Sequence, residues 1–211
     1  MSSITKIGKV SLNSISSIQG TPVTSIAEMV NIIGETTMAG IESIQHVSIL
    51  INSGSNAYAD ATISGVDLDK SFIIQSGHCG YESHPAYQQI SVRLLNSTTV
   101  RAEREAVADW AGATTDAYVI EFSDGINSIQ RGSVTFPTYG AGNQTVDTSI
   151  NSVDLDKAIV VFSAHGSKHA SGMFYTPRMY LSSATNLRGI RSGQYKDTIT
   201  ATVQYEVVEF S

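Results

Sequence analysis

Apolar and polar residues alternate along most of the chain after residue 40, in short stretches separated by clusters of Gly, Asn and Ser. Val47, Ile49 and Ile51 recur with a period of two, as do Val134 and Phe136 further along. A period of two places such side chains on one face of an extended strand. Helical periodicity is nearly absent from this part of the chain. The pattern therefore predicts many short antiparallel β-strands with turns between them.

The pattern after residue 40 occurs twice. Val66-Asp67-Leu68-Asp69-Lys70 recurs letter for letter at residues 153–157, 87 residues later, and an apolar run follows each copy. The flanking segments also match, since residues 40–45 correspond to residues 125–130 at an offset of 85. The small change in offset is what loop insertions produce.

The duplication predicts an all-β protein with two tandem antiparallel β-sandwich units, of the jelly-roll or immunoglobulin-like kind, at residues 40–123 and 124–211. Asp124-Gly125 joins the two units without a linker. The apolar runs 72–74 and 159–162 indicate strands that are apolar on both faces, as expected where a unit meets its sister unit or a neighbouring chain.

Residues 1–39 differ from the rest and predict an extended N-terminal arm. A steady helical stripe is disfavoured by Gly8, Asn13 and many serines, although a capping pattern predicts a short helix from Ser25 to Gly34. One interpretation is a flexible leader. The apolar content favours an arm that anchors the protein to a partner. Its apolar side chains are those of Ile4, Ile7, Val10, Leu12, Ile15 and Ile18.

The amino-acid composition of the chain limits the classes of function that it can have. Charged residues make up 15% of the chain, against roughly 25% in typical soluble domains, and small polar residues replace them, as in β-rich extracellular and virion proteins. The net charge of −6 and the lack of a basic run argue against nucleic-acid binding. The single Cys79 fits folding in a reducing cytoplasm. We expect no membrane insertion, because the apolar runs are too short to span a bilayer.

The repeated acidic segment allows two interpretations. Two carboxylates two residues apart could share a Ca²⁺ ion. Alternatively, they form a turn in which Asp side chains accept backbone N–H groups and Lys closes the turn. Duplication favours the turn, because a requirement of folding recurs in every copy. The residues concerned are Asp67, Asp69, Lys70, Asp154, Asp156 and Lys157.

Histidines provide the nearest approach to a metal site. We expect His78 and Cys79 in one loop of the first unit and His165 and His169 in the equivalent loop of the second, with His78 aligned to His165. If the two loops met, these four side chains could bind Zn²⁺. Their spacing matches no known zinc motif, so we predict no metal and no cofactor. We interpret them as exposed loop residues or contacts to a neighbouring subunit.

No catalytic motif stands out. The chain lacks a Gly-x-Ser-x-Gly elbow, a Walker-type loop and a Gly-x-Gly-x-x-Gly sequence. The carboxylates of Asp109, Asp116 and Glu121 suggest glycosidase chemistry only if they share one cleft, and nothing in the sequence brings them together. We therefore predict a protein that is not an enzyme.

Aromatic residues lie mainly in the stretches that do not repeat. Tyr81, Tyr87, Trp110 and Tyr175 suit a protein interface or the stacking of a sugar ring. They equally suit the half-exposed rim of a core. The sugar-binding interpretation makes the chain a carbohydrate-binding module for receptor recognition.

Four motifs follow one another in the second unit: Ser128-Ile129-Gln130-Arg131-Gly132, Val153-Asp154-Leu155-Asp156-Lys157, Ala184-Thr185-Asn186-Leu187-Arg188 and Val207-Val208-Glu209-Phe210. Their order resembles the β-sandwich units that recur in virion proteins of tailed bacteriophages. The first unit departs from it, since His46 and Val47 replace Arg131 and Gly132.

The resemblance implies a non-enzymatic virion protein of the tail-fibre, tail-appendage or head-decoration kind, assembled in the cytoplasm of a bacterial host. The N-terminal arm is similar to phage leaders that fix an appendage to the capsid or tail. The expected partners are other virion proteins, further copies of the chain in a homo-oligomer and, in the alternative interpretation, a glycan on the host surface.

Overall fold

The computed structural model describes residues 17–18, 21–22, 40–52, 57–80, 89–104, 112–136, 144–166, 177–191 and 200–211. The chain divides into two compact units, residues 1–38 and residues 39–211. In the first, β1 (Ser17–Ile18) and β2 (Thr21–Pro22) form an antiparallel pair. The predicted helix at residues 25–34 lies outside the described part of the chain.

The second unit contains the repeated segments. Its first half holds β3 (Ile41–Ile51), β4 (Tyr58–Thr62), β5 (Ser71–Gly80), β6 (Ser91–Asn96), β7 (Thr99–Glu103) and β8 (Ala113–Phe122). Its second half holds β9 (Ile126–Phe136), β10 (Gln144–Ser149), β11 (Ala158–Gly166), β12 (Arg178–Ser183), β13 (Asn186–Arg191) and β14 (Ala201–Phe210).

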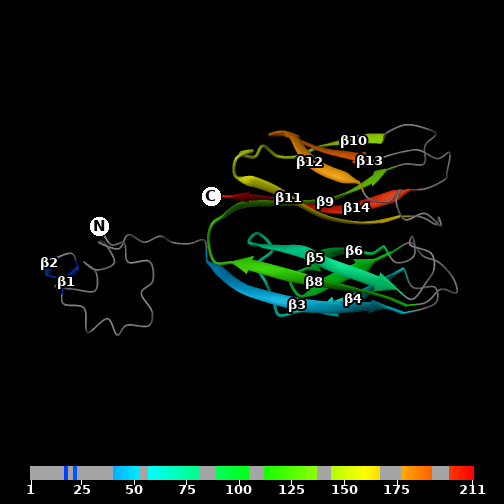
Figure 1. Ribbon diagram of the computed structural model, residues 1–211, viewed down its shortest axis with the longest axis horizontal. Helices are drawn as coiled ribbons and strands as arrows, with labels where there is room; N and C mark the ends of the chain where they lie inside the picture. The colour runs from blue at the N-terminus through cyan, green and yellow to red at the C-terminus, as the bar shows by residue number, and fades with distance from the viewer. Residues whose placement is uncertain are drawn as a thin grey trace. The chain divides into compact units, whose positions relative to one another are not determined.

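The two halves have the same strand topology (Figure 1). The first half forms the three-stranded sheets β3-β8-β5 and β4-β7-β6, and the second forms β9-β14-β11 and β10-β13-β12. Every pairing within them is antiparallel. The described residues contain no helix, so the prediction of an all-β, antiparallel protein is confirmed.

Each half has its own hydrophobic core, to which both of its sheets contribute. The predicted inward residues Val47, Ile49 and Ile51 of β3 are buried against side chains of β6, β7 and β8. Val134 and Phe136 of β9 are buried in the second core in the same way. The alternation along these strands therefore marks the buried face correctly.

The repeated acidic segment makes the same turn twice. The Asp67 carboxylate accepts a hydrogen bond from the Asp69 N–H at 2.9 Å, and the Lys70 N–H donates to the Asp67 carbonyl at 3.1 Å. In the second half the Asp154 carboxylate accepts from the Asp156 N–H at 3.0 Å. A side chain that bonds its own backbone two residues ahead stabilises a turn without any ligand.

A glutamate from the last strand of each half holds this turn in place. Glu121 accepts from the Asp67 N–H at 2.7 Å, and Glu209 accepts from the Asp154 N–H at 2.7 Å. The hydrogen bond from the Asp154 N–H is the main reason why the pKa of Glu209 is lowered. The glutamate of each closing strand is thus part of the framework.

At one equivalent cross-strand pair the two cores differ in which strand carries the larger side chain. Val47 opposes Ala117 in the first half, whereas Gly132 opposes Tyr205 in the second. A Cβ added at Gly132 would lie 2.5 Å from the Tyr205 hydroxyl. The large ring therefore occupies the space that a valine side chain fills in the other copy.

This exchange predicts strong coupling between Gly132 and Tyr205. Gly132→Val should destabilise the protein by about 1–3 kcal/mol through overpacking, and Tyr205→Ala by about 3–5 kcal/mol through a cavity. The double variant recreates the pair of the first half and should lose less than the sum of the two. Urea unfolding of the four proteins measures this, and additive losses would contradict it.

Candidate functional site: the polar junction between the halves

The outer edges of β5 and β6 lie against the second half of the same compact unit. Among the described strands each is the last of its sheet, so its outer edge carries backbone groups that pair with none of them. Strand β11 contacts both β5 and β6, and β14 contacts β6. Polar side chains of the second half bind these edges, and we call this contact the junction.

An ion pair between the buried Glu206 and the partly buried Arg131 covers the edge of β5. Arg131 Nε lies 2.7 Å from Glu206 Oε1, and the Glu206 side chain is 8% exposed. Glu206 Oε2 accepts from the Ile73 N–H at 2.7 Å, while Arg131 donates to the Ser71 carbonyl. The pair thus supplies one acceptor and one donor to backbone groups that a neighbouring strand would otherwise satisfy.

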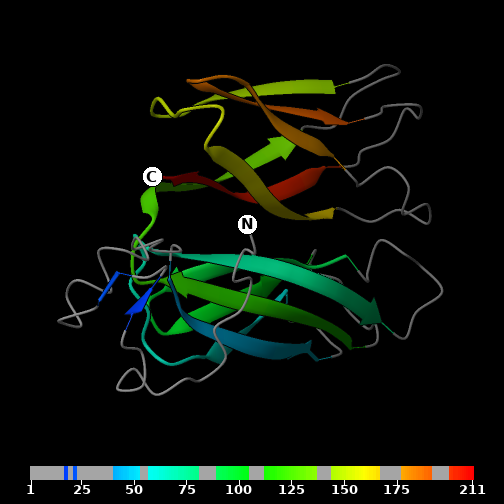
Figure 2. The same ribbon diagram turned by 60° about the vertical axis from the view of Figure 1, so that its left-hand side comes forward.

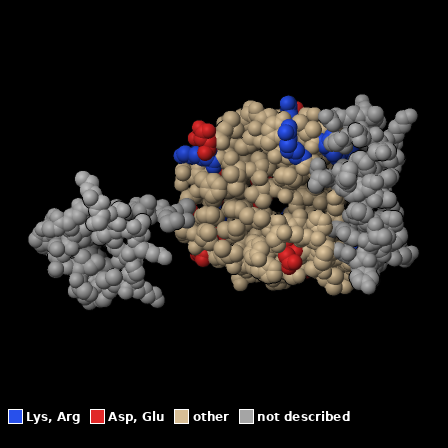
Figure 3. Space-filling view, viewed as in Figure 1, with Lys and Arg blue, Asp and Glu red and all other residues tan. Residues whose placement is uncertain are grey.

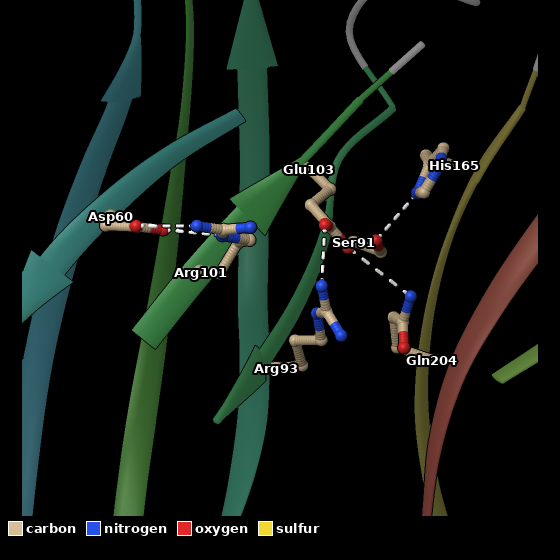
Figure 4. A network of polar contacts seen from close by, with 7 residues as sticks. All are labelled: Asp60, Ser91, Arg93, Arg101, Glu103, His165 and Gln204. Carbon is tan, nitrogen blue, oxygen red and sulfur yellow. Dashed lines mark hydrogen bonds and ion pairs between the residues drawn. The ribbon is translucent and has the colours of Figure 1, made fainter. Parts of the chain in front are cut away.

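Three further contacts continue the junction toward β6 and β7. Ser163 Oγ accepts from the Val92 N–H at 2.8 Å and donates to the Val92 carbonyl at 3.1 Å. His165 Nδ1 lies 2.7 Å from Ser91 Oγ (Figure 4). Gln204, drawn in the same view, donates to the Glu103 carboxylate at 3.4 Å.

A cavity of about 250 Å³ lies within the junction, between Ile73 and Val92 on one side and Val161, Ser163 and Glu206 on the other. It has room for several water molecules at about 30 Å³ each. In Figure 3 the surface is hollowed near its middle, and most of the described surface on this side is uncharged.

Burial shifts the pKa of two junction residues. Burial raises the pKa of Glu206, and the Arg131 guanidinium acts in the opposite direction. Burial lowers the pKa of His165, which Arg93 lowers further and the Glu103 carboxylate raises. His165 is therefore held in its neutral form at neutral pH.

The Ser91–His165 contact has the atoms of a nucleophile and a base, but not their accessibility. Ser91 is 0% exposed, and a nucleophile must reach its substrate. The contact instead fixes β11 on β6. Ser91 lies at the start of β6 and His165 near the end of β11, so the hydrogen bond joins the two halves.

Three of the four predicted metal residues lie in strands, not in loops, which corrects the sequence interpretation. In β5, His78 and Cys79 oppose Thr115 and Thr114 of β8, and in β11 His165 opposes Thr202 of β14. The strands extend further than their apolar runs because backbone pairing continues after the side chains have become polar.

His78 and His165 do not occupy equivalent positions in the two halves, so the predicted alignment of these residues is wrong. A bulge between Gln75 and Gly77 shifts the register of β5 by one residue. Cys79 therefore takes the place that His165 has in the second half. Among the described residues no group of three His, Cys, Asp or Glu side chains is placed to bind a metal. His169 lies outside that part of the chain.

Two of the three carboxylates considered for catalysis have structural contacts far apart on β8. Asp116 lies 3.1 Å from His46 on the outer face of the sheet, whereas Glu121 holds the turn at Asp67. Most other predicted site residues fall outside the described residues: Asp109, Tyr81, Tyr87, Trp110, Tyr175, Ile4, Ile7, Val10, Leu12 and Ile15. Ile18 lies in β1 and opposes Thr21.

Sequence reasoning did not identify Arg131, Glu206 or Ser163 as junction residues. A signal exists for Glu206, because it is a charged residue within the mostly apolar run from Val203 to Val208, in which Gln204 is the one other polar residue. A charge in such a run indicates a buried partner. Nothing in the sequence names Arg131 as that partner or Ile73 as the recipient of the hydrogen bond.

Comparison of the chain with protein-family models, curated proteins and solved structures finds no match. No helix in the described segments is long and apolar enough to cross a membrane.

Removing one member of the buried ion pair should be costly. We expect Arg131→Met to lower the free energy of unfolding by about 3 kcal/mol, because Glu206 keeps a buried charge without its partner. Arg188→Met is the matched control, since Arg188 pairs with Asp147 at 2.7 Å on the exposed surface. Chemical denaturation measures both, and equal losses would refute a special role for the buried pair.

His165 makes the stability depend on pH. Its pKa in the folded protein lies below the ordinary value of about 6.5, so the unfolded chain takes up the proton first as the pH falls. The free energy of unfolding should therefore decrease from about pH 7 to about pH 5. His78 acts in the same direction. His165→Gln should show a smaller decrease in urea unfolding, and an unchanged decrease would exclude His165 as a contributor.

Proposed function

We propose that this chain is a non-enzymatic structural component of a tailed-bacteriophage virion. Residues 1–39 anchor it to the capsid or the tail, and two β-sandwich units at residues 40–123 and 124–211 are displayed as an appendage or a decoration. The protein assembles in the bacterial cytoplasm and works in several copies.

The duplicated framework is the observation that carries this proposal. Arg188, which lies in one of the motifs that resemble phage virion units, makes the same contact in the second half that Arg101 makes in the first. Asp60 and Arg101 form a bidentate pair at 2.7 and 2.8 Å, and Asp147 and Arg188 form its counterpart at 2.7 and 2.9 Å. Contacts that recur in both halves suit a scaffold that displays two similar units.

The sandwich interpretation is supported by the shared core of each half. Side chains of β3, β5 and β8 are buried together with side chains of β6 and β7. The second half buries side chains of β9, β11, β12, β13 and β14 together. Two sheets that bury one common apolar layer have the construction of a β-sandwich.

The connection between the halves suits a protein that must hold its shape on a particle. It consists of the short segment around Asp124 and Gly125, where Gly125 has a φ of 84°. A positive φ favours glycine over residues with a Cβ atom. The Ser211 N–H donates to the Gly125 carbonyl at 3.0 Å, so the end of the last strand is tied to the connection.

Deletion of residues 1–39 tests the proposal. The shortened chain should remain folded, because residues 39–211 form a compact unit of their own, but it should no longer join phage particles. Far-UV circular dichroism and thermal unfolding report the fold. Immunogold labelling of particles from cells that supply either chain in trans reports incorporation.

The full-length chain carrying Asp69→Ala serves as the control for substitution and expression. Asp69 is exposed on the repeated turn, so this variant should be incorporated normally. Incorporation of the shortened chain at the level of the control would overturn the anchoring role. Absence of the full-length chain from all particles would overturn the virion role itself.

A further inference from the structure

The junction joins two unlike surfaces of the same compact unit. One is the outer face of the sheet β9-β14-β11, with Arg131, Glu206 and Ser163. The other is the pair of open edges on β5 and β6. A contact between unlike surfaces is heterologous, and it can be repeated from one molecule to the next when both surfaces are present again.

The edge surface occurs a second time. In the described part of the second half, β11 pairs only with β14 and β12 only with β13, so the outer edges of β11 and β12 correspond to those of β5 and β6. The register places Ala158 and Val160 of β11 where Ser71 and Ile73 lie on β5. The Ala158 carbonyl and the Val160 N–H therefore face outward.

The face surface also occurs a second time, on the sheet β3-β8-β5, which is seen broadside in Figure 2 in blue, green and teal. Four of its outer side chains are large, apolar and exposed within residues 40–211: Ile44 is 56% exposed, Leu50 53%, Tyr118 40% and Ile74 38%. The corresponding face of the second half lies against strand edges. An exposed apolar patch of this kind marks an interaction surface.

We propose that copies of this chain associate head to tail, with the outer face of β3-β8-β5 in one copy covering the β11 and β12 edges of the next. The contact repeats between molecules the junction that already joins the two halves. It rests on these contacts alone and does not depend on a role in a virion.

The face carries suitable groups at the two positions that matter most in the junction. His46 takes the place of Arg131, and Tyr118 takes the place of Glu206. Within the chain the imidazole N–H lies against the Asp116 carboxylate at 3.1 Å. In the contact it would turn to the Ala158 carbonyl, and the tyrosine hydroxyl would accept from the Val160 N–H. The two rings lie side by side with their centroids 5.0 Å apart.

Charge complementarity supports the same pairing. Asp116 takes the place of Gln204 on the face, and Arg178 takes the place of Ser91 on the edge. Gln204 donates to Glu103, which opposes Ser91 across β6 and β7, so Asp116 and Arg178 of successive copies would meet as opposite charges. Gly77 replaces Ser163 and supplies no hydroxyl, so this ion pair substitutes for the lost hydrogen bonds.

The full-length chain tests the proposal directly. Sedimentation velocity at increasing concentration, up to about 1 mM, should show dimers and then longer species, because this range detects an interface of millimolar Kd. Ile74→Glu places a charge on the face and should abolish association. Leu155→Glu is the matched control, since Leu155 is also exposed, at 49%, but lies on the repeated turn.

Val160→Pro blocks the edge, because proline removes the one N–H that the neighbouring face would bind. Arg178→Glu is a second edge variant that changes only an exposed side chain. Circular dichroism and thermal unfolding verify that each variant is folded. Each should remain monomeric at concentrations where the wild-type chain assembles.

A mixture of a face variant and an edge variant tests whether the face of one copy binds the edge of another. Ile74→Glu keeps an intact edge and Val160→Pro keeps an intact face, so an equimolar mixture should form 1:1 dimers and nothing longer. Monomeric wild-type protein at every concentration would overturn the proposal. Undiminished assembly of both single variants would do the same.

Residues 1–39 are the alternative segment that could cover the outer face of β3-β8-β5. A full-length chain that stays monomeric, together with assembly of the chain that lacks these residues, would assign the face to the N-terminal residues and overturn the proposal. Assembly of both chains supports it. None of these outcomes depends on phage particles, so failure here and failure of the virion role are distinguishable.

Discussion

The open edge of a three-stranded sheet is the constraint on which the rest of this structure depends. Strands β5 and β6 end their sheets, and their outward N–H and C=O groups need partners. The second half supplies those partners from the Arg131–Glu206 pair and from Ser163. A burial that desolvates Glu206 is tolerated because the carboxylate accepts from both a guanidinium and a backbone N–H.

The residues that are repeated and those that differ have different tasks. Repeated residues hold each half together: the turn at Asp67 is secured by Glu121, and the turn at Asp154 by Glu209. Residues that differ decide what the outer face of each half contacts. Arg131 and Glu206 cover strand edges, whereas the equivalent His46 and Tyr118 remain exposed. Duplication therefore kept the framework and changed the surface.

The two hydrophobic cores also differ in their side chains, although the strands around them have the same topology. The pair of Val47 and Ala117 is replaced by Gly132 and Tyr205, with the large residue moved to the other strand. A close-packed interior permits such an exchange only when both positions change together. A bulge in β5 is a separate difference, because it moves Cys79 instead of His78 into the position equivalent to His165.

The sequence by itself determined the features that depend on neighbours along the chain. Alternation identified the buried residues of β3 and β9, and the repeated acidic segment identified a pair of turns, because period and turn chemistry are local. It misplaced His78 and His165 in loops, since pairing continued beyond the apolar runs. Only the tertiary structure decided that Glu206 meets Ile73 and that His165 meets Ser91. These contacts depend on which strand edges lie against which sheet face, and no local pattern encodes that choice.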